Sequence, residues 1–333
     1  MASVATPTSA TVVSATLRPR NRRLIRLRDR CVVGGLFGAG IFSILITVAI
    51  VFILFGETLR FFGMPEVSLW SYLTGLEWKP LLGADKKFGM WPLVTGTLMV
   101  TAIAALVALP IGLITAIYLS EFAPARVRAV IKPALEILAG IPTVVYGFFA
   151  LTTITPALRG IVELSTRWMT PAGEPGYSVF EFFNSTSAGI AVGIMCLPTV
   201  CSLSEDALRA VPKGLREAAF GVGGTRFDVA VKVVTPAALS GIVAAFLLAI
   251  SRAVGETMIV SLAAGGMARL ATDPAEGAQT MTAYMVQIFL GDAEFGSVEY
   301  YSSYAIGATL FLMTLGLTLL GNWVLARYRE AYE

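Results

Sequence analysis

Two opposite charges lie inside one of the most apolar parts of the sequence. Arg252 and Glu256 belong to the stretch SRAVGETM, within an apolar run long enough to cross a bilayer. Because charge inside a membrane is costly, ionisable residues there usually serve a function such as an ion pathway. The planar guanidinium of Arg252 could bind two oxygens of a tetrahedral oxyanion at once. The stretch therefore predicts a pathway for an anion.

Glu256 would repel an anion, so its predicted role is to hold Arg252 when substrate is absent. The two residues are four apart, which would place them on one face of a continuous helix. A purely structural ion pair is the alternative that this spacing leaves open.

A second candidate is ILAGIPTVVYGFF, residues 137–149, where Gly140 and Pro142 interrupt another apolar run. Proline cannot donate a backbone hydrogen bond, and a broken helix can turn free N–H groups toward an anion. Thr143 and Tyr146 would add hydroxyl donors nearby. The alternative is a packing kink, with Gly147 allowing another helix to approach.

Other chemistry has little support. The chain has no histidine, and its three cysteines form no CxxC pair, so we expect no metal site. No GxxxxGK[ST] stretch is present, so we expect no ATP site and no cofactor in this chain. Without a nucleophile motif as well, the sequence predicts a protein that is not an enzyme.

The elements that would position these residues are membrane spans. Hydrophobic residues make up 56% of the chain and charged residues 14%, and the mean hydropathy is +0.75; soluble domains carry about 25% charged residues. The sequence thus predicts an all-α, multi-pass membrane protein. We expect six spans, at about 33–55, 91–119, 134–155, 187–203, 237–264 and 302–326.

The basic residues predict the orientation. With both termini in the cytoplasm, the cytoplasmic segments hold 17 of the 25 Lys and Arg and the external loops hold seven. The tail 1–32 carries seven arginines, read as a cytoplasmic anchor rather than a nucleic-acid arm or signal peptide. Residues 33–326 would form the membrane domain and 327–333 a cytoplasmic end. Trp70, Trp78 and Trp91 are expected at the outer membrane interface.

The loop 204–236 carries a spaced motif. Glu217-Ala218-Ala219 is followed after three residues by Gly223, and after nine more by VVTP, which ends at Pro236. This resembles the EAA loop of ABC importer permeases, with Val233 and Thr235 in place of Ile and Leu. In that family the loop docks into a separate ATPase, so the resemblance implies a coupling role for these residues.

Further motifs narrow the resemblance. The basic tail, FGMWPLVTGTL, YLSEFAP, EILAGIPTVVYG and SRAVGETM together resemble the membrane subunits of phosphate ABC importers, of the PstC type, over roughly residues 30–330. The resemblance implies a type I ABC importer core of five helices, at about 91–326, plus one N-terminal helix. It also implies phosphate import across the bacterial inner membrane, with Arg252 and Glu256 linked to phosphate passage.

The same resemblance implies the partners. They would be a second permease of the PstA type, an ATPase dimer of the PstB type that binds ATP and Mg, and an external phosphate-binding protein of the PstS type. Two alternatives stay open. One is an ABC permease for another oxyanion such as molybdate or sulfate. The other is an ion-gradient transporter or channel, which would leave the EAA loop unexplained.

Overall fold

The computed structural model describes residues 22–81, 86–166 and 179–328. The chain divides into two compact units, Met1–Ile53 and Leu54–Glu333. The boundary falls inside α2 (Arg22–Phe62), an apolar helix whose described side chains before residue 51 are exposed. The predicted first span, 33–55, lies within this longer helix, and the predicted tail before residue 22 lies outside the described residues.

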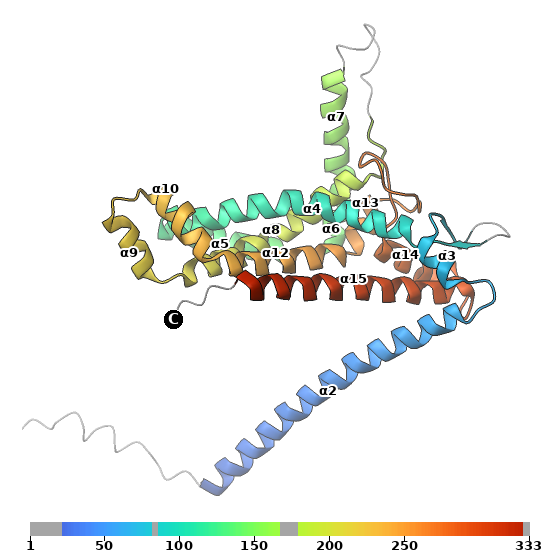
Figure 1. Cartoon of the computed structure of the whole chain (residues 1–333), viewed down its shortest axis with the longest axis horizontal. Coiled ribbons are helices and arrows are strands. Elements are labelled where there is room, and N and C mark those ends of the chain that lie inside the picture. Colours follow the sequence, from blue (N-terminus) through green and yellow to red (C-terminus); the bar gives the residue numbers. More distant parts are fainter. Residues whose placement is uncertain (1–21, 82–85, 167–178, 329–333) are drawn as a thin grey trace, which may run out of the picture. The chain divides into compact units, whose positions relative to one another are not determined.

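The described residues contain five helices long and apolar enough to cross a membrane, and a bent pair that makes a sixth. The straight candidates are Asp29–Phe62, Trp91–Phe122, Thr143–Thr166, Ser185–Ala210 and Val298–Trp323; the bent pair is Arg226–Ala237 with Leu239–Val254, at 70°. In the second unit α4 (Trp91–Ile117), α8 (Ser185–Ala210), α12 (Leu239–Val254) and α15 (Val298–Tyr328) run alongside one another (Figure 1). The predicted all-α membrane fold is confirmed.

The predicted span 134–155 is wrong at both ends. Residues Ala125–Ala139 form a separate amphipathic helix, α5, which ends at Gly140. The span starts again after Pro142 and passes through α6 (Thr143–Phe149), the π-helical turn η2 (Ala150–Ile154) and α7 (Thr155–Thr166). Proline at the break cannot continue the hydrogen-bond ladder of α5. In Figure 1, α7 leaves the direction of the neighbouring helices.

Two other predicted spans also differ from the structure, each for its own reason. The span predicted at 187–203 is the longer α8, because its last turns carry charged side chains that hydropathy excludes. The continuous span predicted at 237–264 is broken: α12 ends at Val254, and a short helix, α13 (Met258–Ala263), follows. Gly255, with no side chain to stabilise the helix, lies at that break.

Close backbone approach holds α4 against α8. A Cβ added at Gly189 would lie 2.6 Å from Cβ of Ile103, and one at Gly193 would lie 2.9 Å from Cβ of Val107. Glycine four residues apart on one helix face lets two membrane helices pack at short range.

One end of the second unit is an aromatic cluster. Here α3 (Leu69–Thr74) meets β1 (Trp78–Lys79), which pairs antiparallel with β2 (Lys87–Phe88), and α14 (Met281–Gln287) with its π-helical turn η5 (Ile288–Asp292). Trp78 is only 3% exposed and stacks edge-on against Tyr284. Trp78 therefore belongs to the core of this end, and its predicted position at the membrane interface stays a prediction.

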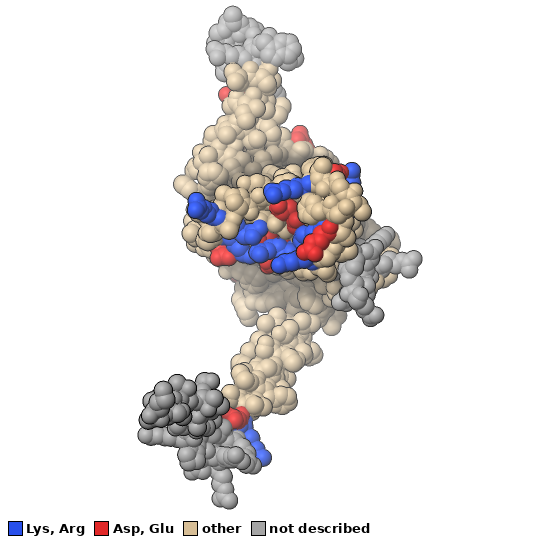
Figure 2. Space-filling view, turned by 90° about the vertical axis from the view of Figure 1, so that its left-hand side faces the viewer, with Lys and Arg blue, Asp and Glu red and all other residues tan. Residues whose placement is uncertain are grey.

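The opposite end carries a cluster of charged side chains (Figure 2). After α8 come α9 (Lys213–Gly221), α10 (Arg226–Asp228), the π-helical turn η4 (Val229–Val234) and α11 (Thr235–Ala237). Figure 2 shows Lys, Arg, Asp and Glu side chains gathered around a hollow at this end.

Candidate functional site

Arg252 lies in the last turn of α12, immediately before the break in the span. Its side chain is exposed, and it makes no hydrogen bond or ion pair with any residue that the structure describes. Its charge acts on the hydroxyl of Tyr146 and the thiol of Cys196, so these groups lie within electrostatic reach. A guanidinium without a carboxylate partner keeps its donors free for an anion.

Glu256 makes other contacts than the predicted ion pair with Arg252. It follows the break, so it does not share a continuous helix face with Arg252, and the two form no ion pair. Its Oε1 accepts hydrogen bonds from the backbone N–H groups of Met258, at 3.1 Å, and Ile259, at 3.2 Å. Glu256 is 9% exposed and caps the N-terminus of α13, where negative charge is favoured.

The predicted interruption at Gly140 and Pro142 is present. The hydroxyl groups of the two nearby residues, Tyr146 and Thr143, differ in their contacts. Tyr146 donates to the carbonyl of Leu138 at 2.9 Å, across the break between α6 and α5. This hydrogen bond therefore links α6 to α5 across the break. Thr143 is half-buried in the first turn of α6, and Pro142 gives that helix no side-chain cap.

The two broken spans meet at α6 and α13. A Cβ added at Gly147 would lie 2.9 Å from Leu262 and 3.2 Å from Cα of Ile259. Gly147 thus allows the close helix approach that the packing alternative describes. This contact packs α6, which follows the break at Gly140–Pro142, against α13, which follows the break after Arg252.

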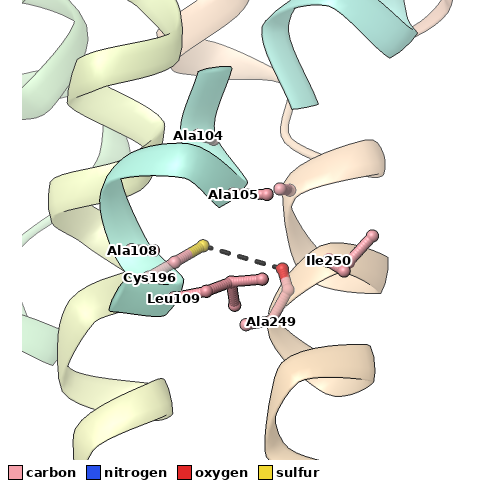
Figure 3. A pocket seen from close by; sticks show the side chains of 8 residues that line it. Ala104, Ala105, Ala108, Leu109, Cys196, Ala249 and Ile250 are labelled. Carbon is pink, nitrogen blue, oxygen red and sulfur yellow. Dashed lines mark hydrogen bonds between the residues drawn. The ribbon is translucent and has the colours of Figure 1, made fainter. Parts of the chain in front are cut away.

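A neighbouring pocket is unsuited to an anion. It is lined by alanines, Leu109, Ile250 and Cys196, whose Sγ lies 3.7 Å from the carbonyl oxygen of Ala249 (Figure 3). Its volume is about 10 Å³, which is at the lower limit for a single water molecule. Its small side chains serve the packing of α4, α8 and α12.

The EAA motif forms a helix, a turn and a second helical stretch. Glu217 and Ala218 are exposed on α9, whereas Leu215 and Ala219 pack against the core at this end. Gly223 has a φ of +88°, which a residue with a side chain rarely adopts, and it turns the chain after α9. Pro236 lies in α11, at the bend into α12.

The turn leaves large apolar side chains uncovered. Phe220 is 47%, Val222 89% and Phe227 64% exposed. Together with Glu217 and Ala218 these residues form a surface around the tip of α9, which we call the α9 surface. Exposed apolar groups of this size beside charged ones are typical of a protein–protein contact.

Sequence reasoning missed a buried carboxylate at the same end. Glu205 on α8 is 1% exposed and lies 3.4 Å from Arg128, 3.6 Å from Lys132 and 3.6 Å from Arg209. From the sequence, only the Glu205–Arg209 pair could have been predicted, because the two residues are four apart and lie one turn from each other on α8. Lys132 also lies 3.4 Å from Asp206, so it pairs with two carboxylates of α8.

A family model decides the identity. Residues 108–330 match the model of the binding-protein-dependent transport system inner membrane component. The chain belongs to this family. It is a multi-pass inner membrane protein and the non-catalytic transmembrane subunit of an ABC transporter. Membership implies an ATPase and a binding protein as partners.

Curated relatives of this permease cover most of its length. It is 33% identical over 308 residues to the probable ABC transporter permease protein YqgH of Bacillus subtilis, covering 92% of this chain and 93% of that protein. It is 34% identical over 264 residues to the phosphate transport system permease protein PstC of Mesorhizobium japonicum, covering 77% of this chain and 78% of that protein.

Solved structures support the permease fold. A bacterial ABC transporter involved in import of the acidic polysaccharide alginate matches with a TM-score of 0.59 at 14% identity, covering 92% of this chain and all of that one. The MetNI methionine ABC transporter matches with a TM-score of 0.52 at 19% identity, covering 72% of this chain and 98% of that one. These likenesses bear on the fold alone.

Proposed function

We propose that this permease forms half of the translocation pathway of an ATP-driven importer of inorganic phosphate. The observation that carries the proposal is Arg252, a guanidinium inside an apolar span at a helix break, without a partner among the described residues. Several relatives that match over most of the chain are named as phosphate permeases of the PstC type, which supports phosphate over other oxyanions.

The chemistry of the site fits a tetrahedral oxyanion. The fork of Arg252 can donate to two phosphate oxygens, and Glu256 leaves the guanidinium unneutralised because its carboxylate caps α13. Thr143, in the first turn of α6, is a further candidate donor. A single strong cation, without a closed cage of ligands, would let the anion bind and leave again.

The proposed partners follow from the α9 surface and from the phosphate assignment. The α9 surface would dock into an ATPase dimer of the PstB type, which binds ATP and Mg. The second half of the pathway would come from a PstA-type permease, and phosphate would arrive on a PstS-type binding protein. The distribution of Lys and Arg supports a cytoplasmic position for both termini and for α9.

The test is uptake of labelled phosphate by cells that carry this permease and its cognate subunits as their sole phosphate importer. We expect uptake to stop on ATP depletion, to resist excess sulfate and molybdate, and to be abolished by Arg252→Gln in an assembled complex. Arg159→Gln, in the other broken span, is the matched control and should keep uptake. Competition by molybdate or sulfate, ATP-independent uptake, or normal uptake by Arg252→Gln would each contradict the proposal.

A further inference from the structure

The end of the molecule that carries α9 contains two arginines arranged in the same way. Each binds backbone carbonyls at the end of one core helix and a carboxylate from the other. Arg216 of α9 donates to the carbonyls of Leu208, at 2.8 Å, and Val211, at 2.6 Å, at the C-terminus of α8. The same guanidinium binds both carboxylate oxygens of Glu121, at 3.0 and 3.3 Å.

Arg128 of α5 mirrors this arrangement. It donates to the carbonyls of Leu119 and Ser120 in η1 (Tyr118–Phe122), the π-helical turn that ends the span of α4. Its Nε lies 3.4 Å from Oε1 of the buried Glu205 on α8. Because the C-terminus of a helix carries partial negative charge, a guanidinium is stabilised at both places.

Of these two arginines, Arg216 belongs to the EAA loop and Arg128 does not. Arg216 immediately precedes Glu217, and its side chain is 18% exposed while that of Glu121 is 12% exposed. Backbone continuity connects α9 directly to α8, but not to α4. The Arg216–Glu121 contact supplies that second connection, so α9 is attached to two core helices at once.

We infer that Arg216 is a positioning residue that transmits movement of α9 to the inner ends of α4 and α8 together. This inference rests on the proposed coupling of α9 to an ATPase. A partner that displaces α9 would pull on both core helices through one rigid guanidinium, because its three nitrogens are all engaged. Lysine could keep the charge at this place but not the fork that joins four acceptors.

The assay is the ratio of phosphate transported to ATP hydrolysed by the complete complex in proteoliposomes, with the binding protein present. For Arg216→Lys we expect this ratio to fall at least about tenfold, since several charge-assisted hydrogen bonds are lost, while the ATPase still copurifies and still hydrolyses ATP. Glu121→Gln, a milder change, should lower the ratio in the same direction. Lys213→Gln is the control, because this exposed lysine of α9 forms no ion pair among the described residues.

A double variant separates transmission from general damage. If Arg216 and Glu121 act through each other, Arg216→Lys with Glu121→Gln should be no worse than Arg216→Lys alone. An unchanged ratio in Arg216→Lys, multiplying losses in the double variant, or loss of the ATPase from the purified complex would overturn the inference. Failure of the wild-type complex to couple uptake to ATP would instead overturn the proposed function.

Discussion

Removing the charge of Glu205 should destabilise the permease far more than removing that of its neighbour. Glu205 is 1% exposed with three cations within 3.4 to 3.6 Å, whereas the side chain of Asp206 is 61% exposed and, among the described residues, pairs only with Lys132, at 3.4 Å. Glu205→Gln keeps the side-chain volume, so it tests the charge and creates no cavity. Asp206→Asn is the matched control on the same turn of α8.

The magnitude follows from the distances. With an effective dielectric constant near 20, each pair attracts by about 5 kcal/mol. Desolvation of Glu205 and repulsion among the cations oppose this, and Lys132 and Arg209 are 33% and 52% exposed, so solvent weakens their share. We therefore expect Glu205→Gln to cost about 3 kcal/mol and Asp206→Asn at most about 1 kcal/mol.

The assay is thermal denaturation of the purified permease in detergent, followed by tryptophan fluorescence at one fixed heating rate. At roughly 2–4 °C per kcal/mol, Glu205→Gln should lower the midpoint by roughly 6–12 °C. Equal shifts in the two variants would refute the reasoning, because exposure would then not decide the strength of the ion pairs. A higher midpoint for Glu205→Gln would show that desolvation outweighs all three attractions.

Three further predictions concern other parts of the molecule. Glu256→Ala should lower the free energy of unfolding by about 2 kcal/mol through loss of the α13 cap. Glu256→Gln keeps a hydrogen-bond acceptor, so its stability should lie closer to that of wild type, whatever its effect on uptake. Equal losses of stability in the two variants would contradict the capping role. Gly193→Ala should cost about 1–3 kcal/mol by overpacking against α4, whereas Gly160→Ala, with open space around it, should be neutral or stabilising; the same melting assay compares them. The backbone N–H of Gly277 and the Arg269 guanidinium hold the pKa of Glu181 below its usual value. Ionised Glu181 thus favours the folded loop above about pH 4.5, and this contribution is lost as pH falls further. The protection factor of the Gly277 amide against hydrogen exchange should then fall in wild type as the pH is lowered, but show no such step in Glu181→Gln.

The sequence was a good guide to the fold and a partial guide to the site. Long apolar runs are a local property, so the existence of the spans and their approximate order could be predicted. The boundaries failed where hydropathy and backbone geometry disagree. The run 237–264 is long and mostly apolar, yet it breaks at Gly255, and the run predicted as 134–155 breaks at Gly140 and Pro142, where α5 ends.

The site divides in the same way. The residue types at Arg252 and Gly223, and the spacing from Glu217 to Pro236, are readable in the sequence because each depends on its own chemistry or on a local turn. The role of Glu256 depends on where α13 begins, and that of Tyr146 on the distance to Leu138 across a break. Neither distance follows from spacing along the chain.

The sequence by itself therefore determined that this chain crosses the membrane, carries an arginine where charge is costly, and presents an EAA loop. It did so because hydropathy, charge and turn geometry act over a few residues. Only the tertiary structure decided which charges are partnered. Glu205 contacts cations from α5 and α8, Arg216 joins α9 to Glu121 some 95 residues away, and Arg252 has no partner in the part of the chain that the structure describes. Apart from Arg209, which lies one turn from Glu205 on the same helix, these paired cations reach their carboxylates across helices that only tertiary packing brings together.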